Sequence, residues 1–181
     1  MREKGHNWPN LTRVESIWNT DSMFFLFQCW YDELNLMDDQ PVNRPVDRLW
    51  ETDVVEIFLR PESCDDYFEI EISPLGQWLD AHIRKPRVDV NFNWSSGLDL
   101  GVEILKSKKF WTAAAKVPFR PILETCGLRN LPQVGDVWRL NLFRMAGRGP
   151  NREFLAWRPT FTRVPDFHVP SAFGNLLFIK D

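Results

Sequence analysis

Apolar and polar residues alternate with a period of two along most of the chain, which is the pattern of β-strands with one buried face. The pattern is cleanest over residues 66–72. One face of that strand takes Phe68, Ile70 and Ile72, and the other takes Tyr67, Glu69 and Glu71. Applied to the whole chain, the alternation predicts strands at 12–18, 23–31, 53–60, 66–72, 77–83, 100–106, 110–117, 137–145, 153–157 and 175–179.

Turn residues between these segments predict how neighbouring strands pair. The polar residues 19–22 predict a hairpin, and two turns within 53–83 predict a three-strand meander. Pro118 and Gly127 flank one short predicted helix. Short strands separated by turn signals favour an all-β fold, a two-sheet antiparallel β-sandwich of jelly-roll or immunoglobulin-like type with about 9–11 strands and at most one short helix.

The length of 181 residues fits one domain with one core. We therefore expect an N-terminal extension at 1–11 and a single β-sandwich domain at 12–181. A net charge of −3 argues against nucleic acid as a partner, because phosphate neutralisation needs a basic face. No apolar run is long enough for membrane insertion, and residues 1–10 do not form a signal peptide. If such a peptide was removed, an extracellular or periplasmic location is expected.

Three cysteines, Cys29, Cys64 and Cys126, have no CxxC or metal-ligand spacing. Our main interpretation is that they are buried or incidental thiols. The alternative is one disulfide and one free thiol.

Nine tryptophans and fourteen phenylalanines are unusual for this length. Aromatic residues fill the cores of sheets, and flat rings on a surface also stack on sugars. Trp18, Trp30, Trp111 and Trp138 lie on predicted strands and are expected in the core. Trp50 instead precedes a strand that carries Glu56 six residues later. A ring beside a carboxylate is an arrangement that binds sugar hydroxyls, and a core tryptophan with a rim glutamate is the alternative.

Other chemistry has weaker support. The chain has no GxSxG, HExxH, P-loop or dinucleotide-binding motif. A glycosidase would need two carboxyl groups, and Glu56 with Glu69 or Glu71 could supply them, although strand glutamates on a solvent face are the simpler interpretation. Haem binding would need axial ligands, for which the candidates are Met23, Met37, Met145 and His168. Weak candidates for calcium are the loop residues Asp38, Asp39, Asp65 and Asp66.

Five ordered segments carry a resemblance to a known family. They are 50–59, 67–76, 135–141, 156–160 and 168–176. Together they resemble the family 9 carbohydrate-binding modules of the DOMON-like β-sandwich superfamily. The resemblance implies a domain without catalytic activity of its own that binds a glycan chain end between two aromatic rings. It also implies a role in carbohydrate catabolism, an attached or partner glycoside hydrolase, no required cofactor, and structural calcium.

The resemblance also implies a site. Trp50 corresponds to the first ring and Glu56 to the nearby carboxylate, whereas Phe167 stands where family binders have a tryptophan. Glu69, Phe143 and Val164 stand where family binders have arginine, glutamine and asparagine. We expect Arg144, Trp157 and Arg158 near the same end as replacement contacts. Because of these departures, the alternative interpretation is a scaffold or interaction domain that has lost its sugar site.

Overall fold

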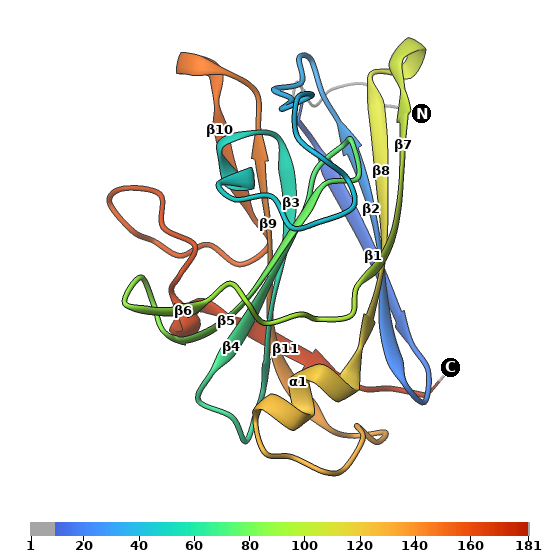
Figure 1. Ribbon diagram of the computed structural model, residues 1–181, viewed down its shortest axis with the longest axis vertical. Coiled ribbons are helices and arrows are strands. Elements are labelled where there is room, and N and C mark those ends of the chain that lie inside the picture. Colours follow the sequence, from blue (N-terminus) through green and yellow to red (C-terminus); the bar gives the residue numbers. More distant parts are fainter. Residues whose placement is uncertain (1–9, 181) are drawn as a thin grey trace.

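The structure is a computed structural model that describes residues 10–180, and it contains two antiparallel sheets facing each other (Figure 1). The small sheet has the order β1-β2-β8-β7. Its strands are β1 (Thr12–Trp18), β2 (Ser22–Trp30), β7 (Asp99–Leu105) and β8 (Phe110–Pro118). β1 and β7 are therefore the edges of this sheet.

The large sheet has the order β10-β9-β3-β4-β5-β6, and β11 also pairs with β9. Its strands are β3 (Val54–Pro61), β4 (Tyr67–Ile72), β5 (Trp78–Lys85), β6 (Asp89–Asn91), β9 (Val137–Ala146), β10 (Glu153–Ala156) and β11 (Gly174–Leu177). β10 pairs with residues 143–146 of β9, and β11 pairs with residues 137–140. The two short strands thus share one edge of β9.

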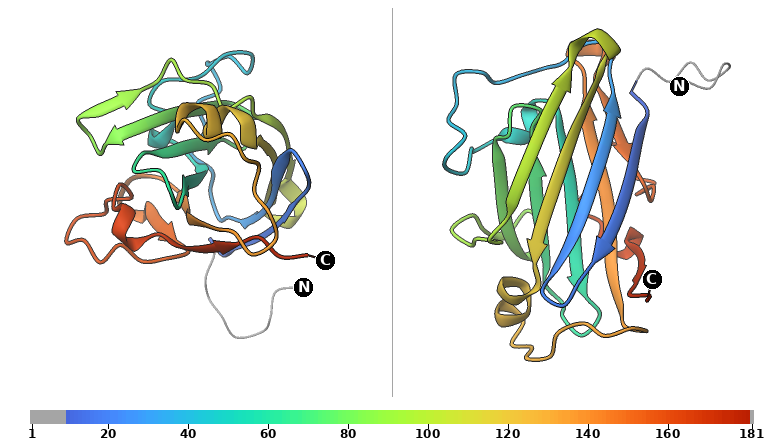
Figure 2. Two further views of the ribbon diagram at one scale, coloured as in Figure 1. Left: turned by 90° about the horizontal axis from the view of Figure 1, so that it is seen from below. Right: turned by 90° about the vertical axis from the view of Figure 1, so that its right-hand side faces the viewer.

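The helices are short. α1 (Phe119–Thr125) follows β8 and lies at one end of the sandwich, as both views of Figure 2 show. The 3₁₀ turns are η1 (Leu49–Glu51), η2 (Lys106–Lys108), η3 (Gly149–Asn151) and η4 (Pro170–Ala172). Within residues 10–180, no helix has the length and apolar character needed to cross a membrane.

The core lies between the two sheets and follows the predicted alternation. Phe68, Ile70 and Ile72 of β4 are fully buried there, together with the inward positions of β3 and β2. Trp111 and Trp138 are core residues as predicted, and Trp18 and Trp30 are only partly buried. The interleaved positions of β3 and β4 lie on the opposite face of the large sheet, which we call the outer face.

The predicted pairings are confirmed for the hairpin across residues 19–22 and for the meander, and the predicted strands at 100–106 and 110–117 also pair with each other. Trp18 pairs with Met23 across the β1–β2 turn, β7 pairs with β8, and β3, β4 and β5 are consecutive in the large sheet. The sequence missed β6, because a three-residue strand is too short to show a period. Asn10 and Leu11 are the only part of the extension 1–11 that the structure describes, so His6 and Trp8 lie outside the described residues.

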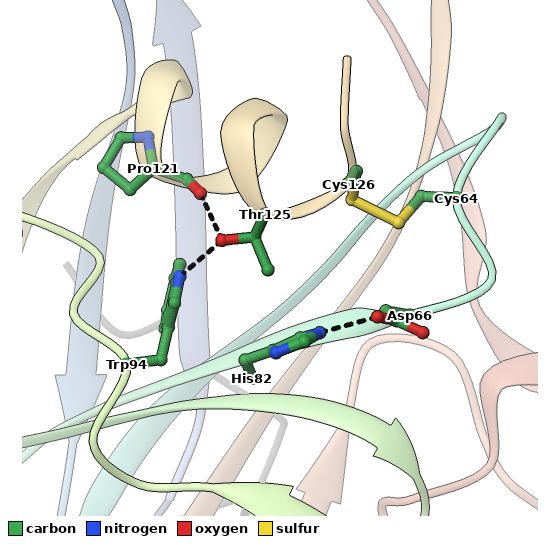
Figure 3. The surroundings of a disulfide bond; sticks show 7 residues. All are labelled: Cys64, Asp66, His82, Trp94, Pro121, Thr125 and Cys126. Carbon is green, nitrogen blue, oxygen red and sulfur yellow. Dashed lines mark hydrogen bonds and ion pairs between the residues drawn. A yellow bond between two sulfur atoms is a disulfide. The ribbon is translucent and has the colours of Figure 1, made fainter.

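The structure contradicts our main interpretation of the three cysteines as buried or incidental thiols. Cys64 and Cys126 form a disulfide, and Cys29 is a buried free thiol. Figure 3 shows the disulfide connecting the β3–β4 loop to the residue after α1. Near the bond, Trp94 donates to the Thr125 hydroxyl at 2.9 Å, and His82 pairs with Asp66 at 2.7 Å.

Candidate functional site

Three glutamates occupy the middle of the outer face of the large sheet. Glu56 of β3 is the cross-strand partner of Glu71 of β4, and Glu69 of β4 lies opposite Phe58 of β3. Directly paired side chains on one face have Cβ atoms about 4.5–5.5 Å apart, so Glu56 and Glu71 are close neighbours. We call Glu56, Glu69 and Glu71 the glutamate layer.

The glutamate layer is buried, contrary to our expectation of a solvent face. The exposed fractions are 1% for Glu56, 7% for Glu69 and 0% for Glu71. One apolar cluster beside it contains Val46, Leu49, Val54 and Leu79, with Trp50 packed against it. The other contains Phe58, Tyr67, Ala81, Ile83, Phe143, Phe167 and Phe173. Loop residues in both clusters cover the sheet, so the glutamates lie between two apolar coverings.

Burial changes the acidity of the glutamate layer. It raises the pKa of Glu69 to about 7. It raises the pKa of Glu56 and of Glu71 well above the ordinary value, and the neighbouring glutamate charges raise both further. Both carboxyl oxygens of Glu71 and Oε1 of Glu56 lack a hydrogen-bond partner within residues 10–180. A raised pKa favours the protonated form, and a protonated carboxyl group can both donate and accept hydrogen bonds.

Two arginines at the edge of the glutamate layer partly offset the effect of burial on its pKa values. The charge of Arg152 lowers the pKa of Glu56, and its Nη2 donates to the main-chain oxygen of Trp50. The charge of Arg87 lowers the pKa of Glu69, although Arg87 pairs with Asp166 at 2.7 Å. No arginine therefore forms a direct ion pair with the layer within the described part of the chain.

His168 also borders the layer and is uncharged at neutral pH. Its Nε2 lies 4.0 Å from Oε2 of Glu69, and its Nδ1 lies 2.8 Å from the hydroxyl of Tyr67. Burial, with the charge of Arg87, lowers the pKa of His168 to about 4. The histidine therefore contributes hydrogen bonding without a positive charge.

Aromatic rings cover the layer. Phe167, 7% exposed, stacks on Phe143 with ring centroids 4.1 Å apart and an interplanar angle of 10°. Trp50 is partly exposed and stacks on Phe92 with centroids 6.5 Å apart. One face of Phe167 is thus already taken by a neighbouring phenylalanine.

The structure separates the predicted site residues into two groups. Trp50, Glu56, Glu69, Phe143 and Phe167 gather on the outer face, as described above. Arg144 instead lies inside the sandwich, and Trp157 is 50% exposed beside β11. The prediction that Arg144 supplies a replacement contact on this face is wrong, because alternate residues of β9 face opposite sides of the sheet and Arg144 faces inward.

Sequence reasoning left three outer-face residues out of the sugar site. Glu71 could have been included, because its alternation with Glu69 places both on one face. Arg152 and His168 come from loops, and the sequence gives no local signal that they fold back over β3 and β4.

The predicted calcium residues are dispersed. The carboxylate of Asp66 is hydrogen-bonded to the side chain of His82. Within residues 10–180, no three His, Cys, Asp or Glu side chains gather in a way that could hold a metal ion. The side chains of Asp38, Asp39, Asp65 and Asp66 thus do not themselves form a calcium cage, and structural calcium stays a prediction.

Comparison with known proteins agrees with the fold and shows the family of the chain. Residues 39–178 match the family described as "Carbohydrate-binding family 9", so the chain belongs to carbohydrate-binding family 9.

Solved structures of similar architecture include a protein from Bacteroides uniformis that is assigned to carbohydrate binding. It has a TM-score of 0.76 and 17% identity over 97% of this chain and 81% of that one. A family 9 module from Caldicellulosiruptor kristjanssonii, solved with glucose, has a TM-score of 0.64 and 12% identity over 96% of this chain and 79% of that one. The same module solved with cellotriose also has a TM-score of 0.64. At these identities the likeness concerns the fold.

Two curated relatives are similar in sequence. The UPF0462 protein C4orf33 homolog of Rattus norvegicus is 27% identical over 145 residues, covering 74% of this chain and 65% of the relative. The human UPF0462 protein C4orf33 is 26% identical over 141 residues, covering 75% and 63%. The chain thus spans slightly less than two thirds of the length of these relatives.

Proposed function

We propose that this chain binds carbohydrate, without catalysing a reaction, on the outer face of its large sheet. The observation that carries the proposal is the glutamate layer beside Trp50 in a domain of carbohydrate-binding family 9. Sugar hydroxyls need partners that both donate and accept, and protonated carboxyl groups do both. The ring of Trp50 supplies an apolar face for stacking.

Glu69 is the group of the layer that reaches the ligand most directly, because it is the most exposed of the three. Glu56 and Glu71 lie deeper, and their burial favours the protonated form of each. Phe167 forms the wall opposite Trp50, backed by Phe143. The two aromatic walls suit the end of a glycan chain, in keeping with the family to which the chain belongs.

Titration of the chain by calorimetry with a panel of mono- and oligosaccharides, glucose and cellotriose among them, tests the proposal. Trp50→Ala should weaken binding about fivefold or more, because stacking on one aromatic ring contributes about 1 kcal/mol or more. Trp157→Ala is the matched control, since it removes an exposed tryptophan from outside the glutamate layer. Equal affinity of Trp50→Ala and the unsubstituted chain for a confirmed sugar would refute this site.

A non-catalytic role agrees with the burial of the acids. Glu56 and Glu71 are 1% and 0% exposed, so only Glu69 of the three reaches the surface, whereas hydrolysis of a glycoside needs two carboxyl groups at the substrate. We expect no reducing-sugar release from polysaccharides by the purified chain. A glycoside hydrolase attached to or associated with the chain would then supply the catabolic activity, and release of sugar that depends on Glu56 would refute the non-catalytic assignment.

The second candidate function is a scaffold or interaction domain. The Phe143–Phe167 stack favours it, since two phenylalanines fill positions where family binders carry polar and larger aromatic residues. A glycan array distinguishes the two functions. Absence of binding to every glycan would favour the scaffold, and binding that is lost in Trp50→Ala would exclude it.

A further inference from the structure

A cavity of about 820 Å³ opens on the side of the sandwich where β1 and the β10–β11 edge approach each other. This volume is within the range of about 300–1,000 Å³ that is typical of small-molecule sites. Its apolar lining includes Val14, Phe27, Leu140, Leu142, Leu155 and Leu176. The inward residues of β9 line it, and so does Phe143, whose ring belongs to the outer-face cluster. None of the three glutamates of the layer lines the cavity.

Arg144 is the exception in this apolar lining. It is 1% exposed, and its Nη1 donates to Thr12 Oγ1 at 3.0 Å and to the main-chain oxygens of Asn10 and Leu11 at 3.1 and 3.4 Å. Its Nε and Nη2 are buried and have no hydrogen-bond partner within residues 10–180. All the acceptors that it does have are neutral.

The acids around Arg144 do not neutralise it directly. Asp53 is near enough for the charge of Arg144 to lower its pKa, yet burial outweighs this and raises the pKa overall. Oδ1 of Asp53 is taken by the main-chain N–H groups of Asn35 and Gly147. Glu153 also lines the cavity, and its Oε2 accepts from the side chain of Asn10 at 2.9 Å.

A buried cation without an ion-pair partner is unfavourable, and an anion that reaches it removes part of that cost. The guanidinium group has planar paired donors that match the two oxygens of a carboxylate. The rest of the lining suits an apolar chain. The cavity therefore combines one anion-binding group with a hydrophobic wall.

We propose that this cavity binds a monocarboxylate with an apolar tail, a fatty-acid-like molecule. Its carboxylate lies at Arg144 beside the hydroxyl of Thr12, and its tail runs along Leu140, Leu142 and the inward residues of β10 and β11. Trp157 is half exposed at the cavity and covers the tail from the outer side. This site is independent of carbohydrate binding on the outer face.

Calorimetric titration of the full chain with dodecanoate below its micelle concentration tests the proposal. Dodecanol carries the same tail without the anion, and dodecyltrimethylammonium carries a cation. We expect dodecanoate to bind at least about tenfold more tightly than dodecanol, because hydrogen bonds to a charged group contribute about 1.5–3 kcal/mol. The ammonium compound should bind more weakly than the alcohol.

Arg144→Met keeps an unbranched, flexible side chain and removes the guanidinium group with its charge. It should weaken dodecanoate binding at least about tenfold and leave dodecanol binding unchanged. Arg139→Met is the matched control, because Arg139 is on the same strand, faces the other side and pairs with Glu62. Leu155→Trp is a second test that retains the arginine, and it should block both ligands by filling the cavity without altering sugar binding.

Three results would overturn the proposal. They are no binding of dodecanoate, equal binding of dodecanoate and dodecanol, and full dodecanoate affinity in both Arg144→Met and Leu155→Trp. Tighter binding of dodecyl phosphate than of dodecanoate would overturn the assignment to a carboxylate. Loss of sugar binding in Trp50→Ala with dodecanoate binding intact would show that the two proposed sites bind their ligands independently.

Discussion

Glu69 is expected to make the stability of the folded chain depend on pH. Burial raises its pKa to about 7 from 4.5, so the folded chain binds this proton more tightly than the unfolded chain. The corresponding stabilisation is complete below about pH 4.5 and is lost as the pH rises through about 7. A shift of this size corresponds to about 3 kcal/mol, and the free energy of unfolding should fall across that interval.

Glu69→Gln removes this titration because glutamine stays neutral. Urea denaturation between pH 5 and 8 should show a smaller pH dependence in this variant and a free energy of unfolding about 1–3 kcal/mol higher than that of the unsubstituted chain at pH 8. Glu103→Gln on β7 is the control, because Glu103 is an exposed strand glutamate. If the two variants show the same pH profile, burial of Glu69 does not govern this dependence.

Residues differ in how far the sequence predicts their roles. The motif around Trp50 and Glu56 located part of the outer-face group, and the alternation along β4 predicted that Glu69 and Glu71 share a face. The same reasoning applied to β9 would have placed Arg144 inward with Leu140 and Leu142. Burial of the glutamates could not be predicted, because it depends on loops that are distant along the chain.

At the scale of elements, local alternation predicted the position of nearly every strand. It did not predict which strands distant in the sequence pair with each other. β8 lies between β2 and β7, and β9 lies beside β3 about eighty residues away in sequence. A strand shows in sequence which of its faces is apolar, but it does not show which edge pairs with which partner. The shared edge of β10 and β11 on β9, which borders the cavity, is a pairing of this kind.

The connection between β9 and β10 should depend on Gly147. Its φ is +83°, and a Cβ there would lie 3.0 Å from the main-chain oxygen of Asn151. Its N–H also donates to Asp53 at 2.8 Å. Gly147→Ala should lower the free energy of unfolding by about 1–2 kcal/mol, because an L-residue is strained at positive φ and this backbone cannot move freely.

Gly149→Ala is the matched control for this loop. Gly149 also has a positive φ, +52°, but a Cβ there would meet no atom within 4 Å. Chemical denaturation should therefore show a smaller loss for Gly149→Ala than for Gly147→Ala. Equal losses would mean that φ alone, and not contact with Asn151, sets the cost.

At the scale of the whole molecule, the large sheet separates two chemically different regions. Its outer face carries the glutamate layer, and its inner face carries Arg144 at an apolar cavity. β9 contributes to both, through Phe143 on the outer face and Arg144 at the cavity, because alternate residues of a strand face opposite sides. The two proposed ligands therefore contact different residues of this strand.

The Cys64–Cys126 disulfide should stabilise the whole sandwich. It connects the β3–β4 loop of the large sheet to the end of α1, which follows β8 of the small sheet, across 62 residues of sequence. Closing a loop of this length in the unfolded chain corresponds to about 4 kcal/mol on the chain-entropy account. For a chain of this size, that corresponds to a fall in Tm of about 10 °C when the bond is absent.

Thermal unfolding with and without a phosphine reductant measures this contribution. The reductant should lower the Tm of the unsubstituted chain, and the Cys64→Ser/Cys126→Ser variant should already melt at the lower temperature with no further response. Cys29 is free and fully buried, so the reductant has no bond to break there. An unchanged Tm in the double variant would mean that the packing between the sheets, and not the cross-link, holds the two layers together.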